Sequence, residues 1–153
     1  GMAIRFTDST GLKTISSRTA EYTIESPQDA WAAIGDFMKK LEPAPDRIII
    51  EGMYVGDNAQ SAVPLIEKAM MFTTICAHYW PAITPLRPQA KQWRPAAFGH
   101  DPSYTKGKRT RCERDAAVAV AKREAVKLCK AHGVEVAGHN AAEAYCMTFY
   151  QPK

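Results

Sequence analysis

The sequence lacks any apolar run that approaches the roughly 18 residues needed for a membrane-spanning helix. It also lacks a basic and then apolar leader at its N-terminus, the pattern of a secretory signal. We therefore expect a cytoplasmic protein with no membrane partner. Cysteine is scarce as well: the four cysteines stand far apart and form no C-x-x-C pair. This spacing indicates neither a disulfide framework nor a zinc knuckle.

The composition is that of one globular domain, residues 1–153, with a single core, because 46% of the residues are hydrophobic and 24% are charged. The charge is unevenly distributed. Between Arg87 and Lys130, twelve Lys and Arg stand against four acids, a net charge of +8, whereas the whole chain carries +4. This split favours a polyanionic partner such as nucleic acid for one face. The alternative is an ordinary solvated basic helix and loop.

Strand and helix signals alternate in the first half of the chain. Short β-prone runs at 3–7, 12–16 and 20–24, separated by turn residues, predict two or three antiparallel strands. A helix is expected to begin after Ser26, because Ser26 can cap it, Pro27 suits its first position and Asp29 places an acid in its first turn. Its end is predicted at Glu42-Pro43, and a second helix at about 59–77.

Three successive isoleucines, Ile48 to Ile50, predict a strand that is buried on both faces, as in the parallel part of an α/β sheet. Glu51 ends that strand. An acid at this position lies where ligands bind in open α/β sheets, and its burial without a cation or donor would be costly. The alternative is that the chain emerges into solvent at Glu51.

The second half of the chain is expected to continue the alternation. Its predicted elements are a proline-interrupted strand at 79–86, a short helix at 88–97, a mobile basic loop at 98–110, a long helix at about 111–132 and a minimal strand at 134–136. A last helix is expected to begin near Gly138-His139-Asn140, with Asn140 as the candidate N-cap, and to run to about 150. Asn140 and Glu143 then project from one face of the first turn. Glu143 has a structural alternative there, since the helix dipole favours an acid near an N-terminus.

Four motifs stand in a distinctive order, and the signal lies in that order more than in any single motif. They are Glu51-x-x-Tyr54-x-x-x-Asn58-x-x-Ser61-Ala62-x-x-Leu65, Trp93-Arg94-x-x-x-x-Gly99, Lys122-Arg123-x-Ala125-x-x-Leu128 and His139-Asn140-Ala141-Ala142-Glu143-Ala144. In this order the chain resembles the RuvC-type Holliday-junction resolvases and their short phage-like relatives. The resemblance covers about Ile48 to Tyr150.

The resemblance implies an RNase H-like α/β fold: a mixed five-stranded sheet, its first three strands antiparallel, flanked by helices, with a first strand that is shortened or missing here. It also implies a homodimeric endonuclease that nicks branched DNA such as Holliday junctions. Two Mg²⁺ ions, or Mn²⁺, held by carboxylates would support phosphodiester hydrolysis. The alternative is a catalytically degenerate RNase H-like protein that binds branched or double-stranded DNA, and a weaker interpretation is a basic protein-interaction module.

The resemblance also assigns the catalytic and metal-binding roles. Glu51 and Glu143 match two acids of the family, and Asp8 is the candidate for its first catalytic aspartate. Asp8 could instead be a turn residue, because residues 4–7 alternate as a half-exposed strand does. Asn140 stands where a second acid is common and is a weaker, neutral metal ligand. His139 could act as a base or face water at the start of the helix.

The remaining assignments concern DNA. Tyr54 matches an aromatic residue that follows the strand and could stack on an unpaired base. Trp93 is as compatible with core packing as with stacking. The residues expected to contact phosphates, with the basic loop ordering on DNA, are Lys91, Arg94, Lys106, Lys108, Arg109 and Arg111.

Overall fold

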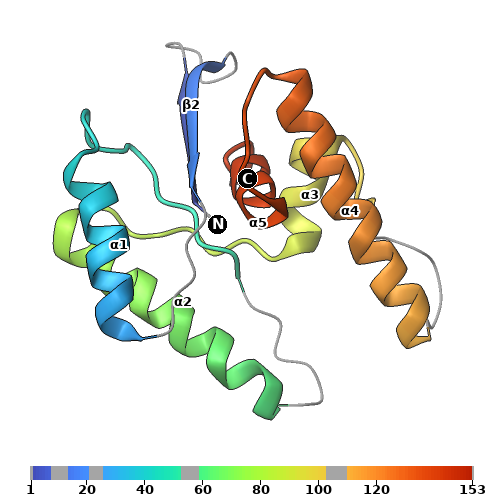
Figure 1. Ribbon diagram of the computed structural model, residues 1–153, viewed down its shortest axis with the longest axis horizontal. Helices are drawn as coiled ribbons and strands as arrows, with labels where there is room; N and C mark the ends of the chain where they lie inside the picture. The colour runs from blue at the N-terminus through green and yellow to red at the C-terminus, as the bar shows by residue number, and fades with distance from the viewer. Residues whose placement is uncertain (1, 8–13, 21–25, 53–58, 103–109, 153) are drawn as a thin grey trace. The chain divides into compact units, whose positions relative to one another are not determined.

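The computed structural model describes residues 2–7, 14–20, 26–52, 59–102 and 110–152 (Figure 1). Its elements are β1 (Met2–Thr7), β2 (Thr14–Ala20), α1 (Pro27–Lys39), α2 (Ala59–Tyr79), α3 (Ala90–Phe98), α4 (Arg111–Ala131) and α5 (His139–Met147). The chain divides into two compact units: unit 1 is Gly1–Glu21 with Lys91–Lys153, and unit 2 is Tyr22–Ala90. A single domain over residues 1–153 stays a prediction.

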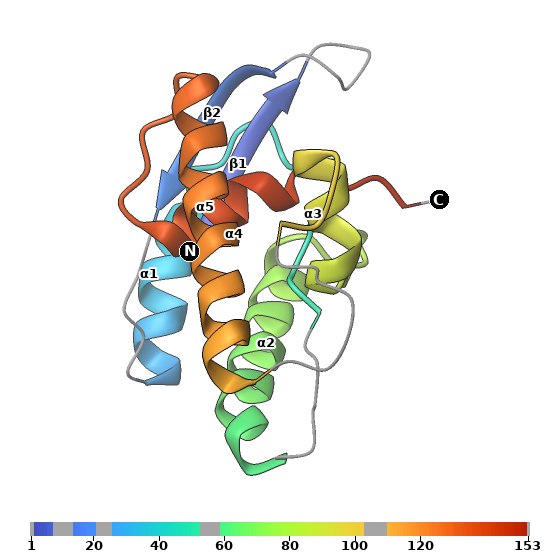
Figure 2. The same ribbon diagram turned by 90° about the vertical axis from the view of Figure 1, so that its right-hand side faces the viewer.

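Unit 1 is built around α5, which packs against both α4 and the β1–β2 hairpin (Figure 2). The two strands pair antiparallel, with Met2 opposite Ala20 and an irregularity between Phe6 and Thr7. Close packing of α4 and α5 is possible because both present small side chains to the core. The buried residues of the two helices include Ala121, Ala125 and Cys129 on α4 and Ala141, Ala142, Tyr145 and Cys146 on α5.

The long helix α4 begins and ends where the local sequence predicts. Thr110 caps it with a reciprocal capping box: its hydroxyl accepts a hydrogen bond from the Glu113 N–H, and the Glu113 carboxylate accepts one from the Thr110 N–H. Gly133 follows the helix with a φ of +67°, a conformation that favours glycine. The predicted helix at about 111–132 is therefore confirmed.

In unit 2, α1 packs against α2. Ser26 caps α1 and Asp29 completes the capping box, so the predicted start of this helix is confirmed. Ala30 and Ile34 of α1 and Ile75 of α2 are fully buried. Burial also raises the pKa of the Cys76 thiol on α2 to about 11.

Residues 48–52 of unit 2 pair in parallel with residues 86–88, but this pairing does not extend into regular strands among the described residues. It consists of hydrogen bonds from the Ile50 N–H to the Leu86 carbonyl (2.9 Å), from the Leu86 N–H to the Ile48 carbonyl (2.9 Å) and from the Gly52 N–H to the Pro88 carbonyl (2.7 Å). The parallel direction agrees with the strand expected at Ile48–Ile50. These isoleucines are half-buried, however, so the prediction of a strand buried on both faces is wrong.

The predicted RNase H-like fold is also wrong. Within the described residues, the structure has five helices and one two-stranded antiparallel sheet, which does not fit a mixed five-stranded sheet. The predicted strand at 79–86 is reduced to a bridge at Leu86, since α2 extends through Tyr79 and the prolines at 81 and 85 have no N–H to donate to a ladder. The predicted strand at 134–136 forms no ladder either.

The last helix begins within the predicted region around Gly138-His139-Asn140, but its N-cap differs from the predicted one. Gly138 is the N-cap of α5 and His139 its first residue, so the prediction of Asn140 as the cap is wrong. Glu143 consequently lies beyond the first turn, where the helix dipole has less effect on it. In the part of the chain that the structure describes, no helix has the length and apolar character required to cross a membrane.

Candidate functional site

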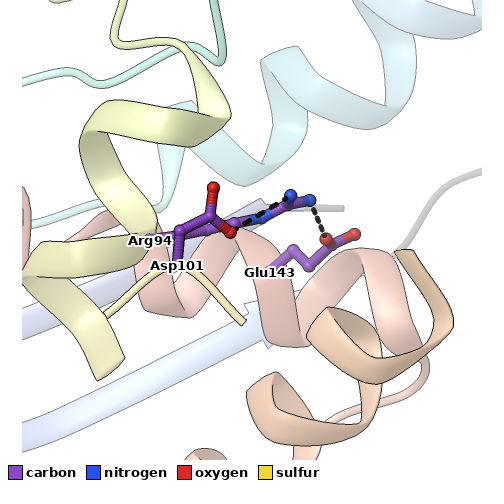
Figure 3. Close-up of polar contacts among 3 residues, drawn as sticks. All are labelled: Arg94, Asp101 and Glu143. Carbon is purple, nitrogen blue, oxygen red and sulfur yellow. Dashed lines mark hydrogen bonds and ion pairs between the residues drawn. The ribbon is translucent and has the colours of Figure 1, made fainter. Parts of the chain in front are cut away.

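Three charged side chains of unit 1 meet below its surface: Arg94 from α3, Asp101 from the segment after α3, and Glu143 from α5 (Figure 3). The Arg94 Nη1 lies 3.9 Å from the Asp101 Oδ1, and its Nη2 lies 3.5 Å from the Glu143 Oε1. The three side chains are 10%, 15% and 19% exposed, respectively. We call this group the Arg94 cluster.

The sequence places Arg94 in this position through its neighbour Trp93. Trp93 is 1% exposed and forms part of the core, which fixes the face that α3 presents to the interior of unit 1. The Arg94 guanidinium also lies 5.4 Å from the centre of the Trp93 ring, within the range of a cation–π contact. Burial of a guanidinium is costly unless anions surround it, and the two carboxylates supply them.

The cluster changes the environment of Glu143, one of the two acids expected to bind metal. Its carboxylate already has a cation as a neighbour, and one positive and two negative charges leave the cluster with a formal charge of −1. Glu143 also affects a thiol in the core. Burial is the main cause that raises the pKa of the Cys146 thiol, and the nearby Cys129 and Glu143 raise this pKa further. Glu143 therefore has a structural role as a partner of Arg94.

The other residues expected at the metal site are distributed over both units. Asn140 and His139 are exposed in the first turn of α5, in unit 1 with Glu143. Glu51 is exposed and belongs to unit 2, and Asp8 lies outside the described residues. Among described residues, no group of three or more His, Cys, Asp or Glu could hold a metal ion. By themselves, the described residues of unit 1 do not fit a Mg²⁺ or Mn²⁺ site.

The residues expected to contact DNA also differ in placement. Lys91 is exposed on α3, whereas Arg94 is buried in its cluster and Trp93 belongs to the core. Arg111 is the first residue of α4, and its side chain is not among those described. The remaining four, Tyr54, Lys106, Lys108 and Arg109, lie outside the described residues.

A stripe of three cations follows α4, and we call it the basic face: Arg123, Lys127 and Lys130. All three side chains are exposed. Their spacing of four and three residues places them on one side of the helix. The opposite side carries the buried residues Ala121, Ala125 and Cys129, so the basic face points away from the core.

An open depression adjoins α3 in unit 1. It is lined by Lys91, Gln92 and Pro95 of α3 and by His100 and Asp101 of the segment that follows. Sequence reasoning missed the last two residues and Gln92. Gly99, with a φ of +76°, was the available signal, because a glycine after a helix indicates that the chain turns back. No local pattern indicates that Asp101 pairs with Arg94.

Comparison of the chain with protein-family models, with curated proteins and with solved structures finds no match. The function is therefore argued from the residues themselves.

Proposed function

We propose that this protein binds double-stranded or branched DNA through the basic face of α4. The observation that carries this proposal is the exposure of Arg123, Lys127 and Lys130 on the side of the helix opposite its buried residues. At 1.5 Å per residue, the stripe extends about 10 Å, a length over which one DNA strand presents about three phosphates. Contacts of this kind give affinity without base recognition.

The basic face remains available to a ligand despite one ion pair. The Lys127 Nζ lies 2.8 Å from the Glu124 Oε1, but both groups are on the surface, where such a pair contributes little. A lysine ammonium has three donors and can contact a phosphate as well. Exposed Lys91 on α3 adds a further cation to unit 1.

Removal of three charges tests this proposal. The combined variant Arg123→Gln, Lys127→Gln, Lys130→Gln should bind a labelled duplex and a labelled four-way junction roughly 50-fold more weakly, on the basis of about 0.8 kcal/mol per lost contact. Fluorescence anisotropy at fixed low salt measures the affinity. The matched control removes three exposed lysines of unit 2, Lys39→Gln, Lys40→Gln, Lys68→Gln. Equal weakening by the two variants would contradict the proposal, as would absence of salt-dependent binding to either DNA.

A second candidate function is Mg²⁺-dependent cleavage of branched DNA, including Holliday junctions, by a homodimer. It is favoured by the position of Glu51, an exposed acid within the parallel pairing of residues 48–52 with residues 86–88. The support is confined to this position and to the motif resemblance around Glu51 and Glu143, since the RNase H-like sheet is not formed.

Incubation of the protein with a labelled four-way junction distinguishes the two candidates. Nicking that requires Mg²⁺ or Mn²⁺ and disappears in Glu51→Gln, but persists in the control Glu67→Gln, would support cleavage; both glutamates are exposed in unit 2. Junction binding without metal, together with no cleavage under either ion, would select DNA binding alone.

A further inference from the structure

We propose that the open depression beside α3 is a phosphate-binding site formed by Lys91, Gln92 and His100. All three side chains are exposed and line the depression. An ammonium, a carboxamide and an imidazolium together offer the N–H donors that a phosphate oxygen accepts. The residues of this site differ from those of the basic face of α4, and the proposal rests on the DNA-binding function for the expected source of the phosphate.

The backbone brings the lining residues together from two segments. Lys91 and Gln92 lie in the first turn of α3, and Lys91 shares a helix face with Pro95 four residues later. Gly99 ends the helix: its N–H donates to the Pro95 carbonyl at 2.9 Å, and its φ of +76° turns the chain back. His100 and Asp101 consequently line the same depression as the start of α3.

The His100 ring is held in a defined tautomer. Its Nδ1 lies 3.1 Å from the Phe98 carbonyl oxygen, which can only accept, so the Nδ1 carries the hydrogen. The Nε2 is then the ring atom left for a ligand. In the imidazolium form the Nε2 also carries a hydrogen, which it can donate to a phosphate oxygen.

The carboxylate in the lining is paired with Arg94, which offsets part of its repulsion of an anion, although Arg94 also serves Glu143. The Arg94 Nη1 lies 3.9 Å from the Asp101 Oδ1, and both side chains are largely buried. Glu124 on α4 also interacts electrostatically with His100, and it pairs with Lys127 at 2.8 Å. Lys91 is thus the exposed cation of the lining, and the acid of the lining, Asp101, is paired with Arg94.

Titration of the full-length protein with inorganic phosphate, followed through the histidine Hε1 resonances by NMR, tests the site. The His100 resonance should move saturably while that of His78, in unit 2, stays in place. Lys91→Gln should weaken phosphate binding roughly tenfold, the effect of one lost charge-assisted hydrogen bond, whereas Lys68→Gln should leave it unchanged. Equal, non-saturating shifts of the two histidines would overturn the proposal.

The variant Asp101→Asn tests whether the depression prefers an anionic or a cationic ligand. Removal of a negative charge from the lining should strengthen phosphate binding about threefold, on the scale of surface charge interactions. Weakened binding in this variant, with an unchanged circular dichroism spectrum, would overturn the proposal, because it would mean that the depression prefers a cationic group.

Competition identifies the source of the phosphate. If a 5′-phosphorylated oligonucleotide displaces phosphate and its 5′-hydroxyl counterpart does not, the site binds a terminal phosphate. Displacement by both oligonucleotides indicates that the site binds a backbone phosphodiester. Displacement by neither indicates that it binds a free small phosphate. Saturable phosphate binding in a protein that fails to bind DNA would leave this site in place and refute the proposed function. DNA binding without any saturable shift of the His100 resonance would refute the phosphate site and leave the proposed DNA-binding function in place.

Discussion

At the scale of single residues, Arg94 has its charge balanced inside unit 1. A guanidinium carries five N–H donors in a planar arrangement, so it can serve two carboxylates from different segments at once. Here those carboxylates belong to Asp101 and Glu143, and the arginine thereby connects α3, the segment after it and α5. The same side chain that could contact a phosphate at the surface has a structural function in the interior.

Arg94→Met should lower the free energy of unfolding by about 3 kcal/mol, because it leaves two largely buried carboxylates without their shared cation. Urea denaturation measures the change. Lys127→Met, which breaks a pair at the surface, is the control and should cost less than about 0.5 kcal/mol. If the charge argument holds, Glu143→Gln in the Arg94→Met background should recover part of the loss. Equal effects of Arg94→Met and Lys127→Met would refute it.

Because of Cys76, the free energy of unfolding should depend on pH in the alkaline range. Burial raises its pKa from 9.0 to about 11, so the folded state retains a proton that the unfolded state releases between these values. The free energy of unfolding should therefore fall as the pH rises through this window, by roughly 2 to 3 kcal/mol from this thiol, and be unaffected by it below. Denaturation of the wild type and Cys76→Ala at about pH 8 and about pH 11 isolates the effect. An identical decline in the two proteins would count against it.

At the scale of elements, the parallel pairing in unit 2 depends on the absence of a side chain at Gly52. A Cβ atom there would lie 2.4 Å from the Arg87 carbonyl oxygen and 3.1 Å from the Pro88 carbonyl carbon. Both are backbone atoms, and the Gly52 N–H bonds to the Pro88 carbonyl at 2.7 Å. A larger residue could be accommodated only if the two segments separated.

Gly52→Ala should consequently destabilise the protein by about 2 to 3 kcal/mol, in the range of overpacked sites. Gly99→Ala provides the comparison, because its Cβ meets nothing within 4 Å and its cost arises from a φ of +76° alone. That cost should be about 1 kcal/mol. Thermal or urea unfolding of the two variants shows which of them loses more stability. A smaller loss for Gly52→Ala than for Gly99→Ala would show that the close approach does not constrain the pairing.

Local chemistry explains which elements could be predicted from the sequence. The start of α1 and the end of α4 follow from Ser26, Pro27 and Gly133, whose effects act over a single helical turn. Strand pairing requires a distant partner. The isoleucine run at 48–50 predicted a parallel direction correctly but not its extent, which depends on residues 86–88 and the prolines before them.

The same distinction applies to the candidate site. Helical spacing is sufficient to place Arg123, Lys127 and Lys130 on one face of α4, and their side chains are exposed in the structure, although they were not among the residues expected to contact DNA. The burial of Arg94 could not be predicted in this way. It depends on Glu143, which is 49 residues away, and on a turn at Gly99. A basic residue next to a tryptophan is compatible with either a surface contact or a core pair.

At the scale of the whole molecule, charge is divided between the two units. Unit 1 contains fifteen Lys and Arg against eight Asp and Glu, a net charge of +7, whereas unit 2 contains five against eight, a net charge of −3. A polyanion should therefore be attracted to unit 1 and repelled by unit 2. Because this attraction is long-ranged, it is also sensitive to salt.

The salt dependence of DNA binding counts the phosphate contacts. Each neutralised phosphate of duplex DNA contributes about −0.9 to the slope of log K against log salt concentration, so loss of Arg123, Lys127 and Lys130 should reduce the magnitude of the slope by about 3. Anisotropy titrations across a series of salt concentrations measure it. The unit 2 variant that lacks Lys39, Lys40 and Lys68 should retain the wild-type slope. A parallel loss of affinity at every salt concentration, with no change of slope in the basic-face variant, would mean that these cations stabilise the protein and do not contact phosphates.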